Sequence, residues 1–204
     1  MMAAREDVAS GEAQVSAYLT AQGLLVERFD KAAMRQGRTP DFRVLAGGRL
    51  AFYCEVKTAQ EDEWLERQLR NAPPLTLVGG ARSDPTYNRV SNQIHSAAGQ
   101  FESVNPGCEY PNVLAIVNND FEAGMPDLVA VLTGNAYTEN GSVLPWYRNF
   151  SEGRIREEKI RIHLYLWFDE GESEPKKFWM QSHAAHHSAL CRHLGIDPAQ
   201  IRQI

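Results

Sequence analysis

The alternation of apolar and polar residues along the chain predicts a mixture of helices and strands. In the first half of the chain we expect helices at residues 10–23 and 86–103, and strands at residues 24–29, 41–45 and 50–57. Ser10 is a typical N-cap and Gly23 a typical C-terminal residue of the first helix, so residues 1–9 are expected to be a loose lead-in. This order of elements indicates an α/β protein.

The second half of the chain continues the mixed pattern. We expect a buried strand at residues 112–119, a short helix at 126–134 and a loop at 134–145. A strictly alternating strand at 159–168, a returning strand at 176–181 and a final helix at 184–194 are expected to follow. A charged segment at 59–71 predicts a surface helix. We expect a single domain over residues 1–204, with a core at about 10–120 and a C-terminal extension at about 125–204 that holds a β-hairpin and a helix.

The second and third predicted strands are separated by a glycine pair and predict a hairpin. The apolar side chains of the third strand alternate and are expected on one face: Leu50, Phe52, Cys54 and Val56. A two-residue turn would place Asp41 opposite Cys54, among apolar side chains, at several kcal/mol for an unpaired buried charge. A three-residue loop, or any bulge of the same parity, places Phe42 there instead. The hydrophobic pattern therefore selects the odd register, which sets Asp41 opposite Glu55.

Asp41 and Glu55 would then have Cβ atoms about 5 Å apart. Two carboxylates so close repel each other unless a cation lies between them. Hard oxygen ligands at this separation suit Mg²⁺ or Mn²⁺. Lys57 follows Glu55 by two positions on the same face and reaches the same place. The residues alone thus predict a metal site with a lysine beside it.

A family resemblance follows from the same residues. The motif consists of Pro40-Asp41, thirteen further residues, and Glu55-Val56-Lys57. It resembles the PD-(D/E)xK nucleases, and a helical Glu12 at the border of the buried helix face makes the layout most similar to Holliday-junction-resolvase-like members. The resemblance covers about residues 10–120. It implies a restriction-endonuclease-like core of helix, three-stranded meander, helix and strand, with a mixed central sheet flanked by helices.

The resemblance also implies an activity and roles for individual residues. The activity is hydrolysis of DNA phosphodiester bonds by water activated on Mg²⁺ or Mn²⁺. The implied metal ligands are Asp41, Glu55, the backbone carbonyl of Val56 and, as an accessory, Glu12. Lys57 would position or activate the attacking water, so the implied catalytic residues are Asp41, Glu55, Lys57 and Glu12. The helix that follows the third strand would send Arg89 and Gln93 toward the substrate.

Two alternatives remain open at this point. The chain could be a catalytically inactive nucleic-acid-binding or assembly subunit on the same fold, or an unrelated α/β protein that carries the motif by accident. A second, decoy motif pairs Pro126-Asp127 with Glu157-x-Lys159. Asp127 is expected to open a helix and Glu157 lies in a charged stretch, so we do not expect a site there.

Other residues that carry chemistry have simpler interpretations. His183, His187 and Cys191 recur every four residues, which spreads them over about 12 Å of helix. That is too far for one ion, so we do not expect zinc. Base stacking on Trp146, Tyr147 or Trp179 would suit a nucleic-acid surface, and packing explains these residues equally well.

Composition limits the classes of function. The chain has 204 residues, 43% apolar and 23% charged, which is typical of a globular protein. A net charge of −5 argues against binding nucleic acid by bulk electrostatics, so a DNA-binding chain of this kind is expected to need a homodimer or a partner protein. Three cysteines without paired spacing favour reduced thiols, and the short apolar runs predict no membrane span; we expect a cytoplasmic protein.

Overall fold

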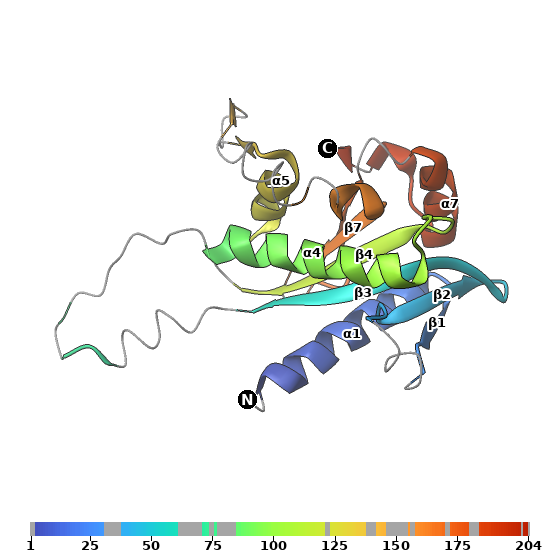
Figure 1. Cartoon of the computed structure of the whole chain (residues 1–204), viewed down its shortest axis with the longest axis horizontal. Coiled ribbons are helices and arrows are strands. Elements are labelled where there is room, and N and C mark those ends of the chain that lie inside the picture. Colours follow the sequence, from blue (N-terminus) through green and yellow to red (C-terminus); the bar gives the residue numbers. More distant parts are fainter. Residues whose placement is uncertain are drawn as a thin grey trace.

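The fold comes from a computed structural model, and it confirms the α/β prediction. The structure describes residues 3–30, 38–60, 71–73, 76, 85–120, 123–137, 142–145, 155, 158–169, 172–179, 184–200 and 202–203. The predicted helix at 59–71 lies largely outside these residues. Figure 1 shows a central sheet with helices packed against it.

The sheet has seven strands within the described residues, in the order β1-β2-β3-β4-β7-β8-β9. Their bounds are Leu25–Arg28, Phe42–Ala46, Arg49–Gln60, Asn112–Asn119, Leu164–Phe168, Lys176–Trp179 and Arg202–Gln203. Strands β1, β2 and β3 form an antiparallel meander, whereas β3, β4 and β7 run parallel to one another. The sheet is therefore mixed, as the family resemblance implies.

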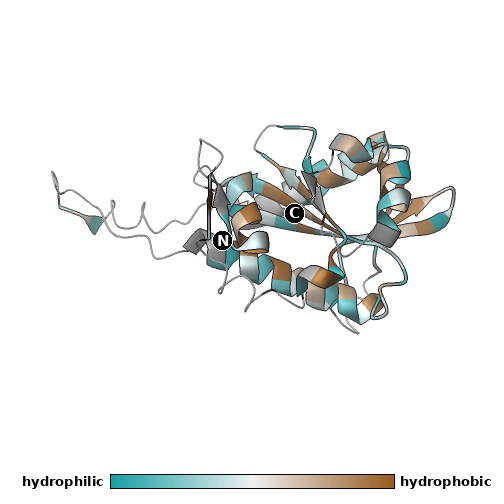
Figure 2. Ribbon diagram, turned by 90° about the horizontal axis from the view of Figure 1, so that it is seen from above, coloured by the Kyte–Doolittle hydropathy of each residue, from teal (hydrophilic) through white to brown (hydrophobic). Residues whose placement is uncertain are grey.

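Two helix layers cover the sheet, and each encloses its own apolar core. Within the described residues, the helices are α1, α4, α5 and α7, at Ala3–Ala21, Pro85–Val104, Met125–Thr133 and Ala184–Leu194. Residues of α1 and α7 pack on one face of the sheet in a cluster that we call the first core. Residues of α4 and α5 pack on the opposite face in the second core. Figure 2 shows the largely hydrophobic strands between these helices.

Helix α1 begins at Ala3, so the prediction of a loose lead-in over residues 1–9 was wrong. The segment before Ser10 is rich in alanine and charged residues with high helix propensity, and these residues extend the helix beyond the expected cap. Gly11 has a packing role instead. A Cβ atom at this position would lie 2.8 Å from Thr58 Oγ1, so the missing side chain lets α1 approach β3 closely.

The β2–β3 hairpin adopts the register that the hydrophobic pattern selects. Phe42 lies opposite Cys54 and Val44 opposite Phe52. The turn itself is tight, with Ala46 opposite Arg49, and a bulge between Val44 and Leu45 restores the parity. The bulge corrects one expectation: Leu50 pairs with Leu45 and is only partly buried, whereas Ala51 joins the first core.

The C-terminal half of the chain completes the same sheet. Strand β7 pairs in parallel with β4, and β8 returns antiparallel to β7 as predicted. The prediction of a strictly alternating strand at 159–168 was wrong in two respects, the start of the strand and its burial. Its first part is a 3-10 turn, η1, at Glu158–Arg161, and β7 is buried along its whole length because both helix layers cover it. A second 3-10 turn, η3, lies at Pro198–Gln200.

The structure also describes part of the expected loop and all three cysteines. The predicted loop at 134–145 contains a short hairpin of two strands, β5 at Ala136–Tyr137 and β6 at Val143–Leu144. Cys54, Cys108 and Cys191 are all free thiols. Among the described residues, no helix has both the length and the apolar character needed to cross a membrane.

Candidate functional site

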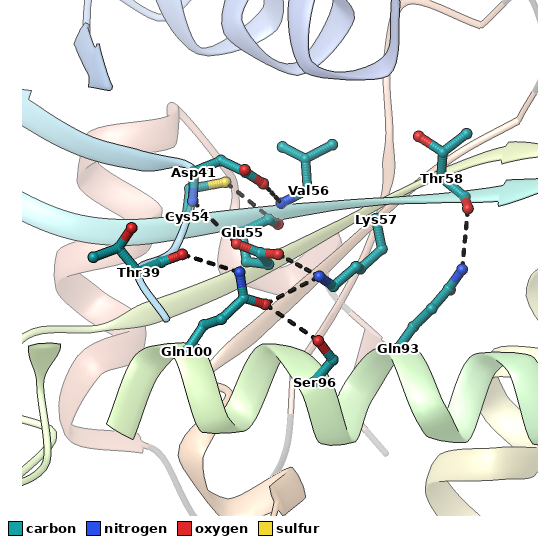
Figure 3. A network of polar contacts seen from close by, with 10 residues as sticks. All are labelled: Thr39, Asp41, Cys54, Glu55, Val56, Lys57, Thr58, Gln93, Ser96 and Gln100. Atoms are coloured by element: carbon teal, nitrogen blue, oxygen red, sulfur yellow. Dashed lines mark hydrogen bonds and ion pairs between the residues drawn. The ribbon is translucent and has the colours of Figure 1, made fainter. Parts of the chain in front are cut away.

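Asp41 and Glu55 lie beside each other and exchange hydrogen bonds with the opposing backbone. The Asp41 amide donates to Glu55 Oε2 at 3.0 Å, and the Val56 amide donates to Asp41 Oδ2 at 2.8 Å. Asp41 directly precedes β2, and Glu55 is in the middle of β3, so the hairpin register fixes both residues. The predicted convergence of the two carboxylates is what the structure contains. Figure 3 shows this arrangement at close range.

Lys57 reaches the same place from the same strand. Its Nζ atom donates to Glu55 Oε1 at 2.5 Å and to Gln100 Oε1 at 3.0 Å. Gln100 lies on α4, and its amide nitrogen donates to the backbone carbonyl of Thr39 at 3.0 Å. Ser96 donates to the same Gln100 oxygen at 3.4 Å. These contacts fix the orientation of the Gln100 amide, which ties the lysine to α4 and to the segment that carries Asp41.

Burial alters the protonation of both carboxyl groups. Glu55 is 1% exposed. Its burial, and then the nearby charge of Asp41, raise the pKa of Glu55 to about 8, although Lys57 acts in the opposite direction. Burial also raises the pKa of Asp41, and the hydrogen bond from Val56 offsets part of that effect. Lys57 therefore does not fully compensate the buried Glu55 and the partly buried Asp41, and the pair has the electrostatic character of a cation site.

Glu12 lies on α1, near enough to Asp41 for its charge to contribute to the raised pKa of that residue. Its carboxylate forms an ion pair with Arg28 of β1, and the side chain of Glu12 is 15% exposed. The structure thus places Glu12 near Asp41, with its carboxylate paired with an arginine. Its role as an accessory ligand stays a prediction, as does that of the Val56 carbonyl.

Arg89 and Gln93 contact the sheet from the polar stripe of α4. Arg89 Nη2 lies 2.6 Å from Asp120 Oδ2, just after the end of β4, and Asp120 is 1% exposed. Gln93 Nε2 donates to the carbonyl oxygen of Thr58 at 3.1 Å. The two side chains therefore face β3 and β4, and their predicted contact with substrate stays a prediction.

The decoy motif and the histidines have other positions. Asp127 accepts a hydrogen bond from the Gly124 amide at 2.7 Å and thereby caps α5, as its place at a helix start predicts. Glu157 and His183 lie outside the described residues, while His187 and Cys191 lie on α7. Within the described part of the chain, no group of three or more His, Cys, Asp or Glu side chains is arranged to hold a metal ion. A cation at this site would thus rest on Asp41 and Glu55 and on further oxygen atoms.

Gln100 was not among the site residues predicted from the sequence. The available signal was its spacing: Gln100 follows Gln93 by seven residues, and both belong to one polar stripe beside the apolar stripe of α4. That spacing puts the two glutamines on the same helix face, two turns apart. It could not show which of them faces Lys57, because this depends on how α4 crosses β3.

Comparisons with protein-family models, with curated proteins and with solved structures gave no match for this chain. The candidate site is therefore supported by its residues and its geometry.

Proposed function

We propose that this protein is a metal-dependent nuclease of the PD-(D/E)xK type that hydrolyses DNA phosphodiester bonds. One observation carries the proposal: Asp41, directly before β2, and Glu55 of β3 meet at one place, and the Lys57 amine lies 2.5 Å from Glu55. The order of helix, three-stranded meander, helix and parallel strand supports a restriction-endonuclease-like core. The motif and the arrangement of its residues thus agree.

The donor set fits a hard divalent cation. Carboxylate oxygens are preferred ligands of Mg²⁺ and Mn²⁺. A cation would offset the burial and the repulsion by Asp41 that together raise the pKa of Glu55. Asp41 and Glu55 would hold the ion, with the Val56 carbonyl and Glu12 as the further ligands that the family resemblance implies. When bound, it would lower the pKa of a water molecule and polarise the scissile phosphate.

Lys57 and Gln100 supply the remaining chemistry of the site. An ammonium group carries three N–H donors, and two of those of Lys57 point to Glu55 and Gln100. Among the described residues, the third donor is available for a water molecule or a phosphate oxygen. Lys57 can thus orient the nucleophile or stabilise the charge that develops on the phosphate. Gln100 keeps the amine in that position.

A cleavage panel tests the proposal. Linear duplex, circular, single-stranded and branched DNA are each incubated with the protein in Mg²⁺ or Mn²⁺, beside the Asp41→Ala and Lys57→Ala variants. We expect wild-type protein to cut at least one of these substrates and both variants to fail, with their folds intact by circular dichroism. Equal cutting by wild type and either variant would contradict the assignment of the site.

The ion pair between Glu12 and Arg28 favours a second candidate function, a catalytically inactive nucleic-acid-binding or assembly subunit on the same fold. A ligand held by an arginine is less available to a metal ion. This candidate predicts binding of DNA without cleavage in any metal, and the Arg28→Ala variant tests it. Cleavage that is absent in wild type and appears in this variant would support it.

A further inference from the structure

A row of aromatic side chains lies beside the Asp41–Glu55 pair. Phe29 stacks on Tyr53, with ring centroids 6.2 Å apart and planes at 25°, and Tyr110 meets Tyr53 edge to face at 6.2 Å. The Arg43 guanidinium lies over the Phe29 ring, 5.3 Å from its centroid. We call Phe29, Arg43, Tyr53 and Tyr110 the stacking row. Its members come from the residue directly after β1, from β2, from β3 and from the loop before β4.

The stacking row is next to the candidate site in the sheet. Arg43 and Tyr53 are opposite each other in the β2–β3 register. Asp41 precedes Arg43 by two residues and Glu55 follows Tyr53 by two, so each carboxylate shares a strand face with a member of the row, about 7 Å away. A chain molecule bound at the carboxylates can therefore reach the stacking row.

Tyr110 is both exposed and held in place. Its side chain is 40% exposed, the largest exposure among the aromatic residues of the row. Asn105, which is 4% exposed, donates to the Tyr110 carbonyl at 2.7 Å and accepts from the Tyr110 amide at 3.4 Å. Cys108 adopts a positive φ of 49° in the same loop. A buried amide thus fixes the backbone of an exposed ring, which is an arrangement suited to recognition.

The charges around the row limit what it can bind. Arg43 lies 3.5 Å from Glu27, and Glu109 is close enough to help raise the pKa of Tyr53, behind burial as the main cause. The positive charge of Arg43 is thus largely balanced by neighbouring acids. Such a surface has little attraction for the phosphates of a duplex, which require excess positive charge. It fits the uncharged face of a nucleobase, which binds by stacking on aromatic rings and on guanidinium groups.

We propose that the stacking row binds an unpaired base next to the phosphodiester bond at the Asp41–Glu55 pair, so that the substrate is single-stranded DNA or a single-stranded segment of a larger DNA. The inference rests on the proposed function, because the carboxylates define where the bond lies. Bases inside a duplex are covered on both faces by their neighbours, so they cannot stack on protein rings without leaving the helix. The row therefore selects strands whose bases are already free.

Binding measurements on the full chain test the inference without requiring cleavage. A fluorescein-labelled oligo(dT) strand and a hairpin duplex of matched length are titrated in EDTA, and the affinity is read by fluorescence anisotropy. We expect Tyr110→Ala to weaken binding of oligo(dT) about ten-fold and to leave the duplex unchanged, since each stacked base contributes substantially to affinity. Tyr110→Trp, which keeps a stacking surface, is expected to restore binding. The loss of oligo(dT) affinity in Tyr110→Ala should persist at high salt, because stacking releases no counterions.

Val143→Ala is the matched control, since Val143 is 51% exposed and lies on β6, outside the seven-stranded sheet. No measurable binding of oligo(dT) by wild type, or equal losses on strand and duplex in Tyr110→Ala, would overturn the inference. The proposed function is judged separately, by cleavage in Mg²⁺. Strand-selective binding that depends on Tyr110, together with no cleavage in any metal, would reject the nuclease and leave the stacking row standing.

Discussion

The central strands β4 and β7 differ from the β1–β3 meander in how many of their faces the apolar cores cover. Strand β7 is buried at every position and β4 at all but its last, and both contribute residues to the first and the second core. The meander supplies the first core with residues such as Phe42 and Phe52. Among its described side chains, those that join the second core are Ala59 and the partly buried Tyr53. The second core thus ends at β3.

The candidate site occupies the place where that core ends. A strand covered on both faces has no room for charged side chains, which explains the continuous apolar runs of β4 and β7. On β3, Glu55 and Lys57 face α4 at the margin of the second core, where Gln100 provides a polar partner. The site thus combines burial, which strengthens electrostatic interactions, with neighbours that remain polar.

The largest expected effect separates two lysine–carboxylate pairs. Lys57 contacts buried Glu55, whereas Lys176 forms an ion pair with Asp169, with 44% and 27% of the two side chains exposed. We expect Lys57→Ala to lower the DNA cleavage rate about a thousand-fold, because the loss of a positioned proton-transfer or charge-stabilising group costs that much. Lys176→Ala, the matched control, should leave cleavage within two-fold of wild type. Initial rates of DNA cleavage in Mg²⁺ measure both effects. Similar losses of rate in the two variants would mean that the Lys57–Glu55 pair has no special role in cleavage.

The next effect concerns stability and is expected in the central strands. Leu166 of β7 is fully buried, and Leu166→Ala should lower the free energy of unfolding by about 3 kcal/mol through lost burial and the cavity that remains. Arg43 in the meander has a side chain that is 46% exposed, and Arg43→Ala should change stability by less than about 0.5 kcal/mol. Urea denaturation in EDTA measures both values. A loss in Arg43→Ala as large as in Leu166→Ala would show that the meander is as tightly packed as the centre.

The same contrast explains which parts of the molecule could be predicted from the sequence. The hairpin register was predictable, because a shift by one residue would bury Asp41 and Arg43 against Phe52 and Cys54 of β3 and would expose Phe42 and Val44. The tight turn with a compensating bulge was not, since several loops satisfy the same parity. The convergence of Asp41, Glu55 and Lys57 followed from that register.

Features that depend on packing between distant elements could not be predicted. The contact of Gln100 with Lys57 depends on how α4 crosses β3, and the ion pair of Glu12 with Arg28 depends on how α1 crosses β1. Periodicity fixes the face of a helix but not its partner on the sheet. The full burial of β7 was missed for a similar reason, because alternation indicates one covered face and the sequence does not show that a second helix layer covers the other.

The pH dependence of stability sharpens the contrast at the site. The pKa of Glu55 is raised to about 8 in the folded protein, above its ordinary value of 4.5, and that of Asp41 is raised in the same direction. The folded protein therefore binds more protons than the unfolded chain between pH 4.5 and 8. The extra bound protons contribute to the free energy of unfolding. This contribution is fully present below pH 4.5 and is lost as the pH rises toward 8. We expect a loss of about 3 kcal/mol between pH 5 and 8 in EDTA, because each pKa unit corresponds to about 1.4 kcal/mol.

Urea denaturation at several pH values measures this loss. Glu55→Gln should flatten the profile, because glutamine has no proton to lose, while Glu102→Gln, at a largely exposed carboxylate paired with Arg161, should keep the wild-type slope. Millimolar Mn²⁺ should restore stability at pH 8 in wild type, since a cation replaces the missing proton. Stability that rises with pH in metal-free wild type would mean that the two carboxylates are compensated by other charges.

The smallest expected effect compares two helical glycines, one on each side of the sheet. An alanine Cβ at Gly11 of α1 would lie 2.8 Å from Thr58 Oγ1 and 3.5 Å from Val117, on the face of the sheet that the first core covers. At Gly99 of α4 it would meet no atom within 4 Å. We expect Gly11→Ala to destabilise the protein by about 1 kcal/mol, because overpacking exceeds the gain in helix propensity. Gly99→Ala should stabilise it by about 0.5–1 kcal/mol through helix propensity alone. Thermal unfolding followed by circular dichroism compares the pair; stabilisation by both substitutions would mean that α1 can move away from β3 at little cost, and the close packing of the covered face would then not hold α1 in place.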